Sequence, residues 1–232
     1  PELQGVMGED YARQAGEEEE VARAVFEHYL PRHAGDDLPH SRIGALISIA
    51  DKLDSIVGCF SIGIIPTGSQ DPYALRRQAS GIVQIIQDKA WPLTLNQLFA
   101  TAINVLKKQQ TMQRSEEELT EDLQQFFSLR IKNQISSLAR YDVIDAVMAA
   151  SINDIGAVAR KAAVLAEETN QPGAKNFFDA LTRVGNLAEK ADHTEVDPNL
   201  FEEAAEKSLY EAWTQMSERY RHLLQNGEEH QA

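Results

Sequence analysis

Cysteine is almost absent from this sequence, with Cys59 alone among 232 residues. One cysteine excludes an internal disulfide and a multi-cysteine metal site, and it fits a reducing cytoplasm. Long hydrophobic runs are also missing, because the apolar stretch around Cys59, residues 57–65, is far too short to cross a bilayer. No signal-peptide pattern opens the chain, and because the first residue is not Met we expect a piece of a longer protein.

Glycine and proline are sparse, with 13 and 8 residues, and aromatic side chains make up only 7% of the sequence. The hydrophobic fraction of 43% is nevertheless that of a globular protein, and aliphatic residues and alanine dominate it. Alanine, leucine, glutamate and glutamine are abundant, and all four are good helix formers. Because no strand-length alternation of apolar and polar residues competes with helical spacing, the sequence predicts an all-α fold.

Positive charge is scarce, since 22 basic residues face 36 acidic ones and the formal net charge is -14. Taken alone, this balance argues against nucleic-acid binding, because phosphate contacts come from Lys and Arg. Much of the acid is local, in residues 17–20, 116–118 and 195–229, which we interpret as solvated helix surface. Whole-chain charge can hide a local basic face. Residues 128–161 carry three aspartates against five basic residues: Arg130, Lys132, Arg140, Arg160 and Lys161.

Helical periodicity and capping signals divide the chain into a series of helices. Asp71-Pro72 is a favoured start for one helix, and Ser115 to Glu118 form a capping box that starts another.

The least periodic stretch is 107–114, where we place a boundary between domains at residues 1–110 and 111–232. We expect the phenylalanine pairs 126–127 and 177–178 to lie in the core. Helices are expected at 17–30, 43–58, 72–89, from 94, 116–138, 142–150, 154–168, 176–191 and from 198.

Residues 66–77 read Pro-Thr-Gly-Ser-Gln-Asp-Pro-Tyr-Ala-Leu-Arg-Arg. This segment resembles the signature of the β subunit of the bacterial two-subunit glycyl-tRNA synthetase family. Three other segments, 1–8, 27–31 and 50–54, match the family in the right order. Together the four cover most of residues 1–81, which makes the resemblance specific and implies the C-terminal part of that subunit.

Residues 140–147 resemble, more loosely, the start of the family's anticodon-binding domain, which is similar to the helical domain at the end of arginyl-tRNA synthetase. The resemblance therefore implies a partial HD-like helical domain at 1–110 and an anticodon-binding helical bundle at 111–232. It also implies an α2β2 assembly in which the α subunit activates glycine with ATP and Mg. The β subunit would bind glycine tRNA, and no membrane partner is expected.

His28 and Asp51 stand where two metal ligands of an active HD phosphohydrolase would be. In such enzymes His and Asp side chains from several helices hold metals that activate water. Here Tyr29 follows His28, so the adjacent His-Asp pair is missing, and most metal sites need at least three protein ligands. We expect a hydrogen-bonded histidine and a structural aspartate, with no metal and no catalytic residue in this chain.

Arg76 and Arg77 are adjacent on a predicted helix and therefore point about 100° apart. Gly68-Ser69 precedes that helix but lacks the Lys and the spacing of a P-loop, which excludes a nucleotide site there. We expect one arginine to form an ion pair and leave the other for phosphate. The candidate partners are Asp51, Asp54 and Asp71.

RNA recognition is expected in the second half, because proteins read unstacked bases by stacking on aromatic or Arg planes. Two alternatives stay open. One is a helical scaffold that contacts other synthetase domains without touching RNA, which the negative charge favours. The other is an HD-type metal-dependent phosphohydrolase. The candidate tRNA-binding residues are Arg130, Lys132, Asn133, Arg140, Tyr141, Arg160, Lys161, Arg183, Arg76 and Arg77.

Overall fold

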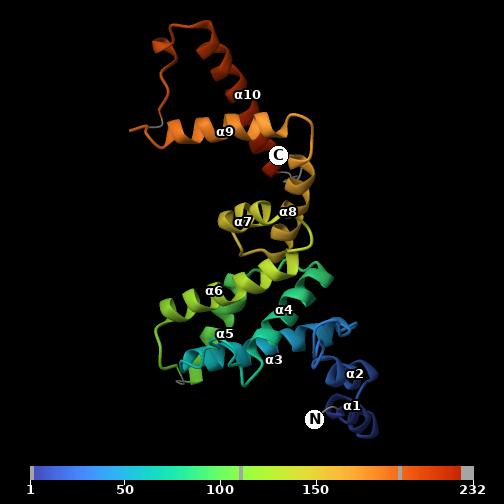
Figure 1. Ribbon diagram of the computed structural model, residues 1–232. Coiled ribbons are helices and arrows are strands. Elements are labelled where there is room, and N and C mark those ends of the chain that lie inside the picture. The colour runs from blue at the N-terminus through green and yellow to red at the C-terminus, as the bar shows by residue number, and fades with distance from the viewer. Residues whose placement is uncertain (1–2, 110–111, 193–194, 226–232) are drawn as a thin grey trace. The chain divides into compact units, whose positions relative to one another are not determined.

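A computed structural model of the chain describes residues 3–109, 112–192 and 195–225 (Figure 1). In these ranges the chain forms helices and no strand, which confirms the predicted all-α fold. None of the described helices combines the length and apolar character that a membrane span needs. The helices are α1 (Gln4–Gln14), α2 (Glu19–Glu27), α3 (Arg42–Ser61), α4 (Leu75–Lys89), α5 (Leu95–Gln109), α6 (Glu116–Ile135), α7 (Tyr141–Ala150), α8 (Ile155–Thr169), α9 (Ala174–Ala188), the short 3-10 helix η1 (Pro198–Leu200) and α10 (Ala204–Gln225).

The chain forms two compact units, Pro1–Ala163 and Val164–Ala232. The predicted boundary at 107–114 includes residues 110 and 111, which lie outside the described residues. The helices on its two sides, α5 and α6, pack against each other within the first unit. The assignment of an HD-like domain to 1–110 and an anticodon-binding domain to 111–232 stays a prediction.

Local capping explains where the helices of the first unit begin. Ser115 and Glu118 form the predicted capping box at the start of α6, with each side chain accepting from the other residue's backbone N–H. The carboxylate of Asp71 also caps α4, accepting from the backbone N–H groups of Leu75 and Arg76 at 2.8 and 3.0 Å. Because Ala74 is left-handed, with φ 55°, α4 begins at Leu75 rather than near Pro72 as predicted.

The first helix, α1, was not predicted from the sequence. It packs closely against α2 because two glycines face that helix. A Cβ atom at Gly5 would meet the rings of Tyr29 and Phe26 at 3.0 and 3.1 Å, and one at Gly8 would meet Val25 at 2.8 Å. The contact surface of α1 therefore contains little apolar side chain, and hydrophobic periodicity misses it.

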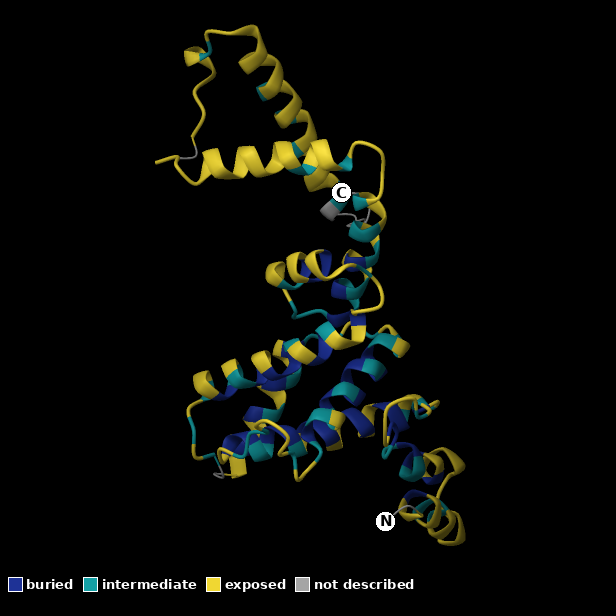
Figure 2. Ribbon diagram, viewed as in Figure 1, coloured by how far each residue is buried: buried dark blue, intermediate teal, exposed yellow. Residues whose placement is uncertain are grey.

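The core of the first unit lies between α3, α4, α5 and α6, where buried residues line the facing sides of the helices (Figure 2). Phe126 and Phe127 are both buried, as predicted. Phe126 contacts Phe60 of α3 and Phe127 contacts Phe99 of α5, with ring centroids 4.9 and 5.2 Å apart. Helix α6 thus joins the two halves of the predicted domain division in one core.

The second unit differs. Within its described residues, α9 buries none of its side chains. Phe177, predicted to be core, is 64% exposed, and Phe178 is half-buried. The prediction for Phe177 was wrong because an apolar helical stripe reports what a helix can bury, and not whether another element covers it.

Candidate nucleic-acid interface

Four of the ten predicted RNA-binding residues lie where α6 ends and α7 begins. We call Lys132, Asn133, Leu138, Arg140 and Tyr141 the α6–α7 corner. Helix α6 ends at Ile135, and the turn is closed by hydrogen bonds from the Ser136 N–H to the Asn133 carbonyl and from the Leu138 N–H to the Ile135 carbonyl. Arg140 is the N-cap residue of α7.

Burial of apolar residues holds this corner together. Ile135 at the end of α6 and Val143, Ile144 and Val147 along α7 are all buried. They anchor the inner faces of the two helices. The polar and aromatic side chains of the α6–α7 corner are consequently left on the outside.

Tyr141 is the aromatic residue of the corner, and 77% of its surface is exposed. Leu138 is 46% exposed and Leu129, on α6, is 53% exposed. An exposed ring offers a face on which an unpaired base can stack, and stacking on aromatic side chains tolerates any base. Asn133 is exposed as well, although its backbone carbonyl is used in the turn.

Both cations of the corner are ion-paired to aspartates of α7. The Lys132 ammonium lies 2.5 Å from the Asp145 carboxylate. The Arg140 guanidinium donates through Nε and Nη2 to the two carboxylate oxygens of Asp142, at 3.1 and 2.7 Å. Partial loss of hydration raises the pKa of Asp142, but hydrogen bonding and charge from Arg140 outweigh it, and the pKa is lowered. Each side chain in these pairs is 43 to 71% exposed.

Arg130 does not belong to this surface, which corrects the prediction from sequence. It is 7% exposed, its guanidinium carbon lies 3.7 Å from the Phe126 ring centroid, and Nη1 donates to the Phe126 carbonyl at 2.7 Å. Burial, followed by the nearby charge of Arg76, lowers the pKa of Arg130. The spacing of four residues after Phe126, on the apolar face of α6, is the sequence signal that indicates burial.

The prediction that Arg76 or Arg77, at the start of α4, pairs with Asp51, Asp54 or Asp71 was wrong, since neither arginine has an ion pair with these aspartates in the described structure. The carboxylate of Asp71 instead accepts from backbone N–H groups. Arg76 is half-buried close to Arg130, whereas Arg77 is exposed and donates through Nη1 to the carbonyl of Arg32 at 3.1 Å. Arg77 is thus the more accessible of the two for phosphate.

The remaining candidates lie on later helices. Arg160 and Lys161 are exposed on α8. Arg183 is exposed on α9, which belongs to the second unit, so it does not extend the α6–α7 corner within one compact unit. The structure therefore brings together Lys132, Asn133, Arg140 and Tyr141 from the predicted set.

A buried lysine that was not predicted from the sequence links α3 to the end of α2 and the segment that follows it. Lys52 is buried, and its ammonium donates to the carbonyls of His28 and Leu30, both at 3.0 Å, and to the Ser48 hydroxyl at 2.8 Å. Burial lowers the pKa of Lys52 to about 8. A lone lysine on a largely apolar predicted helix was the available signal.

His28 and Asp51 are placed unfavourably for holding a metal. The His28 ring lies against Tyr29, with centroids 3.9 Å apart, and Asp51 is exposed on α3. Within the described ranges, no group of three His, Cys, Asp or Glu residues is arranged to hold a metal ion. The buried Lys52 ammonium beside the His28 carbonyl would also repel a divalent cation there.

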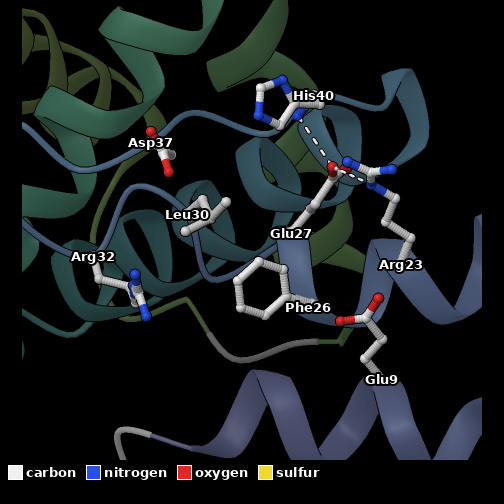
Figure 3. A pocket seen from close by; sticks show the side chains of 8 residues that line it. All are labelled: Glu9, Arg23, Phe26, Glu27, Leu30, Arg32, Asp37 and His40. Carbon is white, nitrogen blue, oxygen red and sulfur yellow. Dashed lines mark hydrogen bonds and ion pairs between the residues drawn. The ribbon is translucent and has the colours of Figure 1, made fainter.

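A cavity of about 240 Å³ lies near the end of α2, with a buried carboxylate at one side (Figure 3). Glu27 accepts from Arg23 Nε at 3.0 Å, from the Ser41 N–H at 2.9 Å and from the Ser41 hydroxyl. Burial would raise the pKa of Glu27, but the hydrogen bonds from Ser41 outweigh it and lower the pKa. The carboxylate of Glu27 therefore holds Ser41, the N-cap residue of α3, in place. The cavity is lined by Glu9, Arg23, Phe26, Glu27, Leu30, Arg32, Asp37 and His40.

Comparison with known proteins gives one consistent family. The sequence model described as "Glycyl-tRNA synthetase beta subunit" matches residues 1–149. The chain is 45% identical over 230 residues to the glycine–tRNA ligase beta subunit of Halalkalibacterium halodurans, covering 98% of this chain and 33% of that protein. It is 44% identical over 214 residues to that of Bacillus subtilis, covering 92% and 30%. The chain thus spans about a third of the length of these curated relatives.

Proposed function

Because the chain belongs to the glycyl-tRNA synthetase β-subunit family, we propose that it binds glycine tRNA as part of a glycine–tRNA ligase and carries no catalytic centre of its own. The contact is assigned to the α6–α7 corner. The observation that carries this assignment is the exposed Tyr141 ring next to Arg140, with Lys132 on the adjoining helix end. An anticodon loop offers unpaired bases to the ring and phosphates to the two cations.

The chemistry of glycine attachment belongs elsewhere in the proposed enzyme. An α subunit would activate glycine with ATP and Mg, in an α2β2 assembly, while the β subunit holds the tRNA. Contacts remote from the reacting centre contribute by orienting the substrate. The isolated chain is accordingly expected to be inactive in glycine-dependent ATP–pyrophosphate exchange, and activity of the pure chain would contradict this division of roles.

A second candidate is a helical scaffold that contacts other synthetase domains without touching RNA. The net charge of -14 and the ion-paired state of Lys132 and Arg140 favour it. A phosphohydrolase is the weakest alternative, because no group of three possible metal ligands is arranged together in the described part of the chain and the Lys52 ammonium lies 3.0 Å from the His28 carbonyl. Substitution of the corner residues separates the two proposals, because it should weaken tRNA binding only if the corner contacts RNA.

The test is titration of the whole β subunit with glycine tRNA at several salt concentrations. Lys132→Ala and Arg140→Ala should each reduce the slope of log affinity against log salt by about 0.7–0.9, the value for one phosphate contact. Tyr141→Ala should weaken binding by about 1–3 kcal/mol, whereas Tyr141→Phe should bind like the wild type, because stacking needs only the ring.

Arg42→Ala is the matched control, since Arg42 is an exposed arginine at the start of α3, outside the α6–α7 corner. It should leave both the affinity and the salt slope unchanged. If the three Ala variants of the corner all bind like the wild type, the corner does not contact tRNA and the scaffold is the better account. Arg130→Ala is unsuitable for this purpose, because removing a buried guanidinium disturbs packing.

A further inference from the structure

The two cations of the α6–α7 corner are paired with the protein's own carboxylates. The fork between Arg140 and Asp142 uses two parallel N–H···O bonds. This is the geometry in which Arg also binds phosphate. The Lys132–Asp145 pair joins α6 to α7 at 2.5 Å, so the two pairs lie on the same helix junction as Tyr141.

We propose that Asp142 and Asp145 occupy the phosphate positions of an RNA site in the free protein, so that RNA binding exchanges two intramolecular carboxylates for phosphates. This inference rests on the proposed function, because it concerns the regulation of the same surface. The two aspartates act as internal competitors for Arg140 and Lys132.

The exposure of the four side chains makes this exchange possible. Asp142 and Asp145 are 46 and 52% exposed, and Arg140 and Lys132 are 71 and 43% exposed. Ion pairs at such sites contribute little to stability and are readily replaced by other ions. Each aspartate can therefore turn into solvent without opening the apolar contact between α6 and α7.

The competition has a consequence for selectivity. A phosphate alone must displace a carboxylate that is already in place, so the gain from each cation is small. An RNA loop that also stacks a base on Tyr141 gains a second contact that the aspartates do not oppose. The corner should therefore favour loops that present both features over duplex RNA, and this selectivity should fall when the aspartates are removed.

The experiment uses the whole β subunit and the anticodon stem-loop of glycine tRNA as the probe, with binding measured by fluorescence anisotropy. Asp142→Asn and Asp145→Asn keep the side-chain shape and remove the charge. Each should tighten binding, and the double variant should bind several-fold more tightly than the wild type. Thermal unfolding of each variant checks that folding is unchanged.

A double-mutant cycle separates competition from a general loss of negative charge. In the Lys132→Ala background, Asp145→Asn should no longer tighten binding, because there is no ammonium left to release. The same should hold for Asp142→Asn in the Arg140→Ala background. Glu121→Gln, a change at an exposed carboxylate elsewhere on α6, should have little effect.

The outcomes distinguish the inference from the function on which it rests. If the wild type binds the stem-loop and Lys132→Ala weakens binding, but the Asn variants bind like the wild type or the gain persists in the Ala background, internal competition is overturned and RNA binding stands. If neither the wild type nor any Asn variant binds, both are overturned. Tighter binding that disappears in the Ala backgrounds supports both.

Discussion

Helices α6 and α9 both carry apolar residues at helical spacing, but their surroundings differ. In the first unit, α6 buries Phe127 and its neighbours against α3, α4 and α5. In the second unit, α9 leaves Phe177, Leu181 and Val184 between 55 and 64% exposed. A stripe of helical period therefore indicates the face that a helix can bury, whereas the actual burial depends on elements far away in the sequence.

Because of this difference, side chains in the two units should contribute unequally to the free energy of unfolding. The first unit contains a packed core, so truncating its side chains removes both transfer free energy and packing contacts. The exposed side chains of α9 have little transfer free energy to lose. Substitutions of the same chemical kind should consequently have unequal effects in the two units.

The largest effect is expected for Phe127→Ala. Phe127 is fully buried and contacts Phe99, so its removal should destabilise the first unit by about 3–5 kcal/mol. Urea unfolding of the whole β subunit, followed by hydrogen exchange in α6, measures this. A loss below roughly 1 kcal/mol, outside the range for buried Phe, would show that the core is not formed as described.

Glu27→Gln should have the next largest effect, about 1.5–3 kcal/mol, because it weakens charge-assisted hydrogen bonds at a buried carboxylate. The pKa of Glu27 is lowered in the folded protein. Its ionisation therefore stabilises the folded state above the ordinary glutamate pKa, and this contribution is lost as the pH falls through the lowered value. The difference between wild type and variant should shrink on acidification. A difference that is constant with pH would contradict the assignment.

Asn153→Ala should cost about 0.5–2 kcal/mol, the range for loss of a helix N-cap. The backbone carbonyl and side-chain oxygen of Asn153 accept from the N–H groups of Leu95 and Asn96, both at 2.9 Å. The turn before α8 thus caps the start of α5. Hydrogen exchange of the Asn96 amide should accelerate in the variant, while that of Gly44, capped by Ser41, should stay unchanged.

The smallest effect is expected for Phe177→Ala, which should change stability by less than about 0.5 kcal/mol, as for most surface substitutions. Leu181→Ala serves as a second exposed position on the same stripe. Hydrogen exchange across α9 in the whole β subunit is the measurement. A cost approaching that of Phe127→Ala would mean that α9 is covered, and the contrast between the two units would disappear.

Features that depend on residues close together in the sequence were predicted correctly. The capping box at Ser115, the cap at Asp71 and the buried pair Phe126-Phe127 all follow from residues within one or two helical turns. The exception was the start of α4, where the left-handed Ala74 shifts the helix to Leu75.

Long-range contacts explain what the sequence did not predict. Lys52 bonds to carbonyls more than 20 residues earlier, and Asn153 caps a helix that begins 58 residues before it. For the candidate site, residue type predicted that Lys132, Arg140 and Tyr141 lie together. It could not predict that Asp145 pairs with Lys132, because that contact depends on the angle between α6 and α7, whereas the Arg140–Asp142 pair is local to the start of α7.

The most direct test of tRNA binding at the α6–α7 corner is site-specific photo-crosslinking in the whole β subunit. A photoreactive phenylalanine analogue replaces Tyr141, and a control subunit carries it at Leu46, an exposed residue of α3. With glycine tRNA bound, position 141 should crosslink to the anticodon loop and position 46 should not. Crosslinks from position 141 that are absent, or that map outside the anticodon arm, would contradict the account.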